Sequence, residues 1–111
     1  MTQSIDSDNL EMLKEVMEDE FGLLLQTYIE DCQSRIPQMK EQLAGTKVDE
    51  LRRNAHSLKG SSSNIGAIPL SDLARQLEDL AAAGGLEGAS ELVDQISIEF
   101  ETVHEALKAF L

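Results

Sequence analysis

Apolar residues recur every three or four positions in five stretches of the chain, and this spacing predicts helices. The expected helices cover roughly residues 8–18, 20–44, 46–65, 69–83 and 88–110. No stretch alternates apolar and polar residues long enough to predict a strand, and the connections are short. The economical packing is an antiparallel four-helix bundle with a short additional N-terminal helix capping one end. We therefore expect an all-α fold in which residues 1–111 form a single domain.

Residues with known preferences for helix ends mark several of these boundaries. Asp8 is the expected N-cap of the first helix, and Thr46 that of the third. Pro37 lies within the second helix and removes one backbone donor, so we expect a bend there rather than a stop. Gly45 and the pair Gly84–Gly85 are expected to end the second and fourth helices.

Composition and charge narrow the range of partners. Because the chain is 41% hydrophobic but only 4% aromatic, the core must be mainly aliphatic, and we expect it to include Met12, Met17 and Met39. The formal net charge of −12 disfavours nucleic acid and membrane surfaces as partners. The chain has no long apolar run, no secretory leader pattern and one cysteine, Cys32, which together favour a cytoplasmic protein.

The third helix combines a solvent-facing histidine with a group of cations. At 100° per residue, His56 lies roughly 140° from the centre of the core face, and is therefore expected in solvent. The core face itself is made of Leu51, Ala55, Leu58, Ser62 and Ile65. Three of the nine cations of this acidic chain, Arg52, Arg53 and Lys59, lie within four residues of His56. Such a cluster predicts a local positive site that suits an anion held at the imidazole.

A run of small polar residues follows the histidine. Residues 60–64 read Gly-Ser-Ser-Ser-Asn, which costs a helix roughly 2–3 kcal/mol of intrinsic propensity. A loop is the alternative, but the core spacing continues through Ile65 and favours a helix. Gly60 lies one turn beyond His56, where a longer side chain would overhang the ring. We therefore interpret the small residues as keeping the imidazole open to a large partner.

The pattern His56-x-Leu58-Lys59-Gly60-x5-Gly66 resembles the signature of histidine-containing phosphotransfer (HPt) domains. The downstream residues Leu70, Leu73, Leu77 and Glu78 also fit that family. The resemblance implies that His56 accepts a phosphoryl group from a receiver-domain aspartate of a hybrid sensor kinase and passes it to an aspartate of a response regulator. It also implies that Lys59 steadies the phosphoryl oxygens and that Gly60 provides clearance.

Other residues receive roles by their position relative to this motif. Members of the family often place a glutamine on the next helix to hydrogen-bond the imidazole; Glu78 has the expected spacing here, and Gln76 is a nearby candidate. We expect Glu78 to be a replaceable orienter of the ring. Partner contacts are expected from Arg52, Arg53, Ser63, Asn64 and Leu23. Leu23 faces away from the seam of its helix, and packing beneath the first helix is favoured over a place in an apolar docking patch.

Several other functions are disfavoured by the sequence. Two distant histidines and one cysteine do not form a metal site, and the chain has no phosphate-binding loop for ATP, so we expect no metal, no cofactor and no kinase activity. His104 is expected to be an ordinary surface residue, and the protein to be a monomer. Two rivals stay open: a docking module that is never phosphorylated, and an excised phosphoacceptor segment of a larger histidine kinase. Met1 and a last helix ending at Leu111 favour a free-standing protein.

Overall fold

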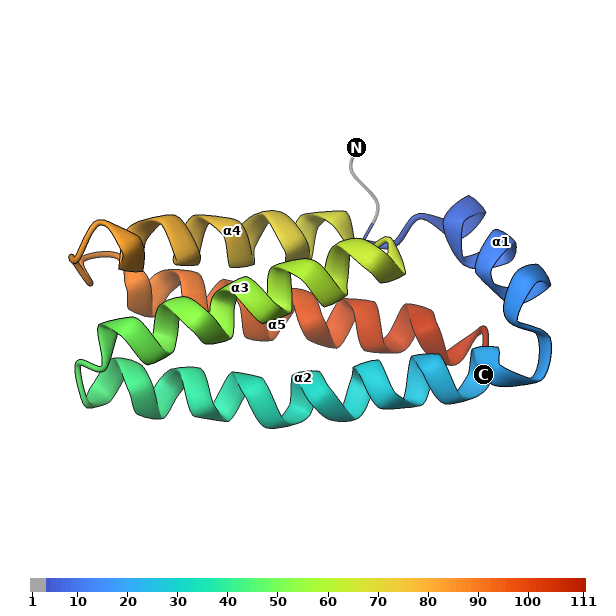
Figure 1. Ribbon diagram of the computed structural model, residues 1–111, viewed down its shortest axis with the longest axis horizontal. Coiled ribbons are helices and arrows are strands. Elements are labelled where there is room, and N and C mark those ends of the chain that lie inside the picture. Colours follow the sequence, from blue (N-terminus) through green and yellow to red (C-terminus); the bar gives the residue numbers. More distant parts are fainter. Residues whose placement is uncertain (1–3) are drawn as a thin grey trace.

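The computed structural model describes residues 4–111 and confirms the all-α fold. Figure 1 shows the long helices side by side and a short helix, α1, at one end. No strand occurs within residues 4–111. The helices in chain order are α1 (Ser7–Met17), the 3-10 helix η1 (Glu18–Glu20), α2 (Phe21–Ala44), α3 (Val48–Ile65), α4 (Ile68–Ala82) and α5 (Ala89–Lys108).

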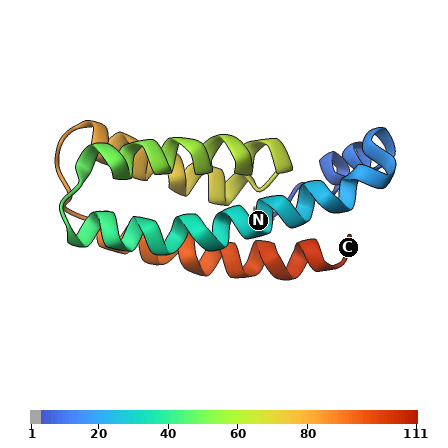
Figure 2. The same ribbon diagram turned by 60° about the horizontal axis from the view of Figure 1, so that its bottom comes forward.

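The four long helices form an antiparallel bundle in which each helix packs against two others. The contacting pairs are α2 with α3, α3 with α4, α4 with α5, and α5 with α2. The α3–α4 pair has the most extensive contact, and the same arrangement can be followed in the turned view of Figure 2. The molecule, including α1, extends 42 × 28 × 19 Å. Its α3–α4 pair carries the histidine-containing segment, so the packing of these two helices positions the site.

The core is mainly aliphatic, as the composition predicts. The α3 side chains Leu51, Ala55, Leu58, Ser62 and Ile65 are all buried, which confirms the expected core face. Complete burial of one leucine or isoleucine contributes about 1.5–3 kcal/mol. Small buried residues on α4, including Ser71 and Ala74, allow α3 and α4 to approach closely. The Ser71 hydroxyl donates a 2.9 Å hydrogen bond to the Lys59 carbonyl oxygen and joins the two helices directly.

Buried polar contacts join α2 to α3. The hydroxyls of Tyr28 and Ser62 lie 2.8 Å apart, and burial raises the pKa of Tyr28 well above its usual range. Asn54 accepts from Nη1 of Arg35 at 3.0 Å and donates to the Arg35 carbonyl at 3.1 Å. Buried polar groups are costly when unpaired, so these bonds favour one register of α2 against α3. Cys32 is a buried core residue whose pKa is raised by burial to about 12.

Gly66 is required at the corner between α3 and α4 for two reasons. Its φ of 91° lies in the left-handed region that glycine adopts without strain. An added Cβ would also lie 3.0 Å from Nδ2 of Asn9 and 3.2 Å from the Cβ of Asp6. The Asp6 N–H donates to the Gly66 carbonyl at 2.9 Å, so the segment before α1 is held on this corner.

Two predicted N-caps are wrong. The N-cap of α1 is Asp6 rather than Asp8, because the Asp6 carboxylate accepts the Asn9 N–H at 3.2 Å. The N-cap of α3 is Lys47; Thr46 has a positive φ of 52° and donates its hydroxyl to the preceding carbonyl instead. The helix through Pro37 continues without a stop, and Gly45 follows the end of α2, both as predicted.

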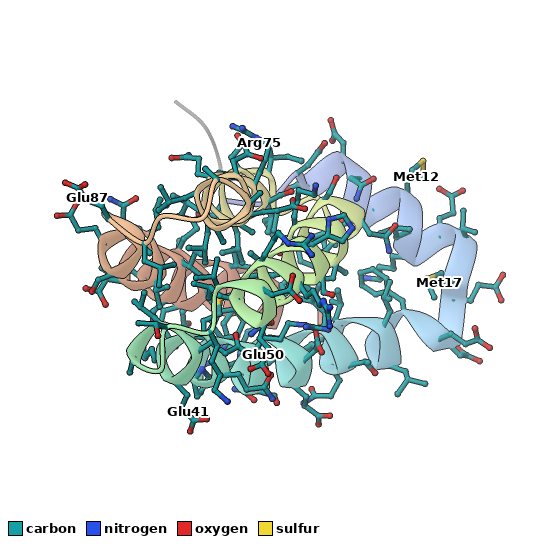
Figure 3. The ribbon with its side chains drawn as sticks, turned by 60° about the vertical axis from the view of Figure 1, so that its left-hand side comes forward. Met12, Met17, Glu41, Glu50, Arg75 and Glu87 are labelled. Carbon is teal, nitrogen blue, oxygen red and sulfur yellow. The ribbon has the colours of Figure 1, made fainter. Side chains whose placement is uncertain are left out.

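Two apolar residues expected to be packed are exposed. Met12 is 56% exposed because α1 lies at the end of the bundle and buries Leu10 on its inner side; Figure 3 shows Met12 on the outer side of α1. Leu23 is 70% exposed, so its predicted packing beneath the first helix is wrong. Met39 is fully buried and Met17 partly buried.

Candidate functional site

His56 lies on the outer face of α3 with 64% of its side chain exposed. Its neighbours Ala55 and Leu58 point into the core, so the backbone beneath the ring is firmly packed. The exposure confirms the position expected from helix geometry. An exposed imidazole on a rigid helix is accessible to another macromolecule without any change in the fold.

Glu78 of α4 connects His56 to Lys59. Its Oε2 lies 2.7 Å from Nδ1 of His56, and its Oε1 lies 2.7 Å from Nζ of Lys59. The Glu78 side chain is only 16% exposed. Ser71 lies seven residues earlier on the same face of α4 and bonds to the Lys59 carbonyl, which holds α4 in register with this part of α3. Gln76, the alternative candidate for this contact, is exposed and has no such bond.

The carboxylate selects one tautomer of the imidazole. The hydrogen bond that Lys59 donates is the largest cause that lowers the pKa of Glu78 below its usual range, and the hydrogen bond from His56 adds to it. An ionised carboxylate only accepts hydrogen bonds, so Nδ1 of His56 must carry the proton that it donates. In a neutral imidazole the lone pair is then on Nε2. The nitrogen available for nucleophilic attack is therefore the one that Glu78 does not contact.

Gly60 continues α3 and has open space beside it. The helix runs to Ile65, so the helical interpretation of residues 60–64 is confirmed. A Cβ added at Gly60 would meet no atom within 4 Å. No packing requirement within the described chain therefore explains a glycine at this position. Ser63 and Asn64 are also exposed on this part of α3, and the Asn64 carbonyl accepts from Nδ2 of Asn9 at 3.4 Å.

The cations near His56 are each paired with a carboxylate. Arg52 and Arg53 both contact Asp49, at 2.8 Å and 2.7 Å, and Lys59 contacts Glu78. The hydrogen bond from Arg52 is the largest cause that lowers the pKa of Asp49. The predicted positive site is therefore weaker than the count of cations suggested. The pairing of both arginines with Asp49 was not predicted, because Asp49 lies more than one turn from His56, toward the start of α3.

A shallow apolar groove between α2 and α3 was not predicted. It has a volume of about 210 Å³, and its lining consists of Leu24, Thr27, Tyr28, Asp31, Ser61, Asn64 and Ile65. The exposed Leu23 precedes the first lining residue on α2. The sequence pattern could not locate this groove because its depth depends on how α2 and α3 pack. His104 is half-buried and stacks on Phe100 with ring centroids 5.6 Å apart, so it is not the fully solvated residue expected.

Two further structural observations concern metal binding and membrane insertion. Within residues 4–111, no three histidine, cysteine, aspartate or glutamate side chains come together in a way that could hold a metal ion. Over the same described range, none of the helices combines the length and apolar character needed to cross a bilayer. Figure 3 shows Glu41 and Glu87 pointing away from the bundle, in agreement with an acidic outer surface.

Comparison with known proteins decides the family. A family model described as the Hpt domain matches residues 23–109. The chain belongs to the Hpt domain family. The crystal structure of histidine-containing phosphotransfer protein B from Pseudomonas aeruginosa resembles this Hpt domain with a TM-score of 0.94 and 37% identity, over 98% of this chain and 95% of that one. The maize histidine-containing phosphotransfer protein ZmHP2 has the same fold, with a TM-score of 0.84 at 19% identity over 96% and 88% of the two chains.

Two curated relatives are longer than this Hpt domain. Histidine-containing phosphotransfer protein 2 of Arabidopsis thaliana is 31% identical over 88 residues, which cover 77% of this chain and 56% of the relative. Chemotaxis protein CheA of Borreliella burgdorferi is 28% identical over 104 residues, which cover 84% of this chain and 12% of the relative. The chain therefore spans just over half of one relative and about an eighth of the other. The resemblance inferred from the His56 motif is confirmed at the level of the family.

Proposed function

We propose that this Hpt domain is a phosphocarrier of a two-component phosphorelay, with His56 as the residue that carries the phosphoryl group. The donor would be a phosphorylated receiver-domain aspartate of a sensor kinase, and the acceptor a response-regulator aspartate. The single observation that carries the proposal is the exposed His56 ring whose Nδ1 contacts Glu78, which leaves Nε2 as the free nucleophile. Phosphoryl transfer depends mainly on positioning and charge stabilisation, so a small helical bundle is sufficient.

His56 is the one residue of this chain whose bonds form and break in the proposed transfer step. The Nε2 lone pair attacks phosphorus, the N–P bond forms, and the P–O bond to the donor aspartate breaks with its electron pair going to the carboxylate. Onward transfer reverses this sequence at the acceptor aspartate. The proposal includes no kinase activity of this chain and no cofactor. Action in the cytoplasm, as a monomer and with residues 1–111 as one domain, is part of the same proposal.

Lys59 and Gly60 have supporting roles in this proposal. The Lys59 ammonium already lies one turn from His56 and is 32% exposed, so it can exchange its contact with Glu78 for a phosphoryl oxygen. Gly60 leaves the approach to the ring unobstructed. Glu78 orients the ring through Nδ1. These three residues come from adjacent turns of α3 and the facing side of α4.

The docking surface for the receiver domain is proposed to surround His56. Arg52, Arg53, Ser63 and Asn64 lie on α3 on either side of it, and Leu23 offers an exposed apolar contact on α2. Burial of an exposed leucine in an interface is favourable, while the charged residues contribute mainly to selection among partners. The acidic remainder of the surface would disfavour strongly anionic partners.

Incubation with a phosphorylated receiver domain tests the proposed function. The protein should acquire phosphate that is labile in acid and stable in base, as expected of a phosphoramidate. His56→Gln should abolish this labelling, and His104→Gln should leave it unchanged because His104 lies on α5. A docking module that is never phosphorylated would bind the receiver without acquiring label. Labelling that survives His56→Gln would contradict the assignment of the carrier residue.

A further inference from the structure

We propose that a groove between α2 and α5 binds a basic amphipathic helix of a second protein partner, distinct from the receiver domain at His56. The lining of the groove includes Gln33, Ile36, Pro37, Ser97, Phe100 and Glu101. None of these residues takes part in the proposed transfer chemistry. The inference therefore goes beyond the proposed function and can be tested separately from it.

The groove lies on a different side of the bundle from His56. α2 packs against both α3 and α5, and Figure 2 shows α2 between these two helices. At 100° per residue, Gln33 and Pro37 lie on the flank of α2 opposite to Leu24 and Asp31, which line the groove beside α3. A receiver domain centred on His56 would therefore leave the α2–α5 groove accessible.

The floor of this groove is apolar and firmly packed. Ile36 and Phe100 are only 5% and 3% exposed, so the core fixes both side chains and they form the base of the groove. Its volume is about 210 Å³. An apolar cavity of about 150 Å³ can hold a benzene-sized group. The α2–α5 groove can therefore accept one leucine or phenylalanine side chain from a partner.

Pro37 leaves a hydrogen-bond acceptor at the edge of the groove. Proline has no N–H, so the carbonyl of Gln33, four residues earlier in α2, lacks its usual helical donor. Gln33 and Pro37 both line the groove. A carbonyl without a helical donor is a favourable contact for a lysine or arginine side chain. The bound segment can therefore donate a hydrogen bond from a basic residue beside its apolar anchor.

The rim of the groove on α5 is acidic. Glu101 lines the groove, and Asp94 and Glu105 lie on the same flank of α5 within two turns of it. All three carboxylates are exposed. Two cations are close in position: Lys40 lines the groove, and Lys108 is already paired with Glu105 at 3.0 Å. The excess of negative charge complements a partner that carries lysine or arginine.

Ile98 extends the apolar surface outward from the groove. It is 70% exposed, follows Ser97 in the chain and lies one turn from Glu101. An amphipathic helix that anchors an apolar residue in a groove also covers apolar side chains at its border and directs its charged residues outward. The combination of an apolar floor, an exposed isoleucine and an acidic rim fits a helix with apolar anchors and basic margins.

Other occupants fit this surface less well. A second copy of the chain also carries a net charge of −12 and would be repelled. Nucleic acid and anionic lipid are repelled for the same reason. The groove runs along α2 from Gln33 to Lys40, which is about two turns of helix. Anchors at positions i and i+4 of a bound helix would match this length.

The test uses the full chain and a synthetic peptide of about 14 residues, with leucines at i and i+4 spacing on one face and lysines on the others. NMR chemical-shift changes should be largest at Gln33, Ser97 and Phe100. Isothermal titration should show that Glu101→Lys weakens binding about tenfold. Glu15→Lys makes the same charge change on an exposed residue of α1, and it should weaken binding by less than about twofold because a distant charge is screened.

A second pair of variants tests the apolar contact. Ile98→Lys should weaken peptide binding about tenfold, whereas Leu23→Lys should have little effect, although both residues are 70% exposed. Equal losses in Glu101→Lys and Glu15→Lys would reveal non-specific attraction to an acidic protein and would overturn the proposal. The absence of binding, or shifts centred on α1 or around His56, would overturn it too.

Two further measurements separate this proposal from its alternatives. Sedimentation of the chain alone should show no self-association that Ile98→Lys abolishes; if it does, a second copy occupies the groove and the proposal fails. Transfer from a phosphorylated receiver domain to His56 should stay within about twofold when the peptide is saturating, because the two surfaces are distinct. A larger loss would contradict the separation of the surfaces. If His56 acquires no phosphate, the proposed function fails, while the peptide titrations still decide this inference.

Discussion

Oε2 of Glu78 on α4 lies 2.7 Å from Nδ1 of His56 on α3, so one helix determines which nitrogen of a histidine on its neighbour is free. The contact depends on the close packing of the two helices, which the hydrogen bond from Ser71 to the Lys59 carbonyl reinforces. The fold and the chemistry of the site are therefore linked through one helix pair. Substitutions can still separate effects on stability from effects on phosphotransfer, because several site residues contribute little to the packing of the helices.

Gly60→Ala should stabilise the fold and slow phosphotransfer. Alanine is the better helix former by about 0.5–1 kcal/mol, and its Cβ would meet no atom within 4 Å in the free protein. Steric conflict with a docked receiver domain should slow transfer about tenfold, since overpacking commonly costs 1–3 kcal/mol. Urea unfolding and transfer kinetics measure the two effects. Gly85→Ala, in the open connection between α4 and α5, is the control and should leave transfer unchanged. An unchanged transfer rate in Gly60→Ala would contradict the proposal that Gly60 keeps the approach to His56 open.

Lys59→Gln should slow phosphoryl transfer by about tenfold to about a hundredfold, because a charge-assisted contact to a phosphoryl oxygen contributes about 1.5–3 kcal/mol. The free energy of unfolding should fall by less than about 1 kcal/mol, since the ion pair is partly exposed. Lys108→Gln removes an equivalent charge from an ion pair on α5 and should transfer at the wild-type rate. Equal transfer rates for Lys59→Gln and Lys108→Gln would contradict a specific role for Lys59 at the phosphoryl group.

Leu23→Asp should weaken binding to a receiver domain about tenfold or more, because burial of a leucine in an interface contributes about 1.5–3 kcal/mol. Isothermal titration against an unphosphorylated receiver domain measures the effect. Ile98→Asp is a closely matched control: Ile98 is also 70% exposed but lies on α5. Neither substitution should lower the free energy of unfolding appreciably. Equal losses of affinity would place the docking surface elsewhere.

Acid should remove the contribution of Glu78 to stability. Its contacts with Lys59 and then with His56 hold its pKa below the usual range, so the folded state binds fewer protons than the unfolded state. The contribution is fully present above the unfolded pKa of about 4.3 and is lost as the pH falls through the lower folded value. The stability difference between wild type and Glu78→Gln in urea should therefore narrow between about pH 5 and about pH 2. A stability difference between wild type and Glu78→Gln that stays constant over this pH range would contradict the lowered pKa of Glu78.

The periodicity of apolar residues was sufficient to predict the helices and most of the core. His56 could be placed in solvent, and Leu58 and Ile65 in the core, because a regular helix leaves few alternatives for the direction of a side chain. Met12 and Leu23 were predicted wrongly, because periodicity identifies the faces of a helix but not what packs against each face. It does not show that α1 lies at the end of the bundle, where Met12 remains exposed and Leu23 of α2 remains uncovered.

The contacts between helices at the site were only partly predictable. Glu78 could be proposed from its spacing to the His56 motif, but its second contact, with Lys59, depends on the rotation of α4 against α3. The pairing of Arg52 and Arg53 with one carboxylate was missed because a count of cations ignores the direction in which long side chains turn. The groove beside Leu24 is formed by α2 and α3 together, so the sequence pattern of neither helix alone predicts it.

The most direct test of the central claim is to locate the phosphoryl group on the phosphorylated protein by phosphorus and nitrogen NMR. The contact between Glu78 and Nδ1 predicts a bond from phosphorus to Nε2 of His56, with the proton retained on Nδ1. Phosphate found on Nδ1 of His56, on His104 or on any other side chain would contradict the proposed mechanism.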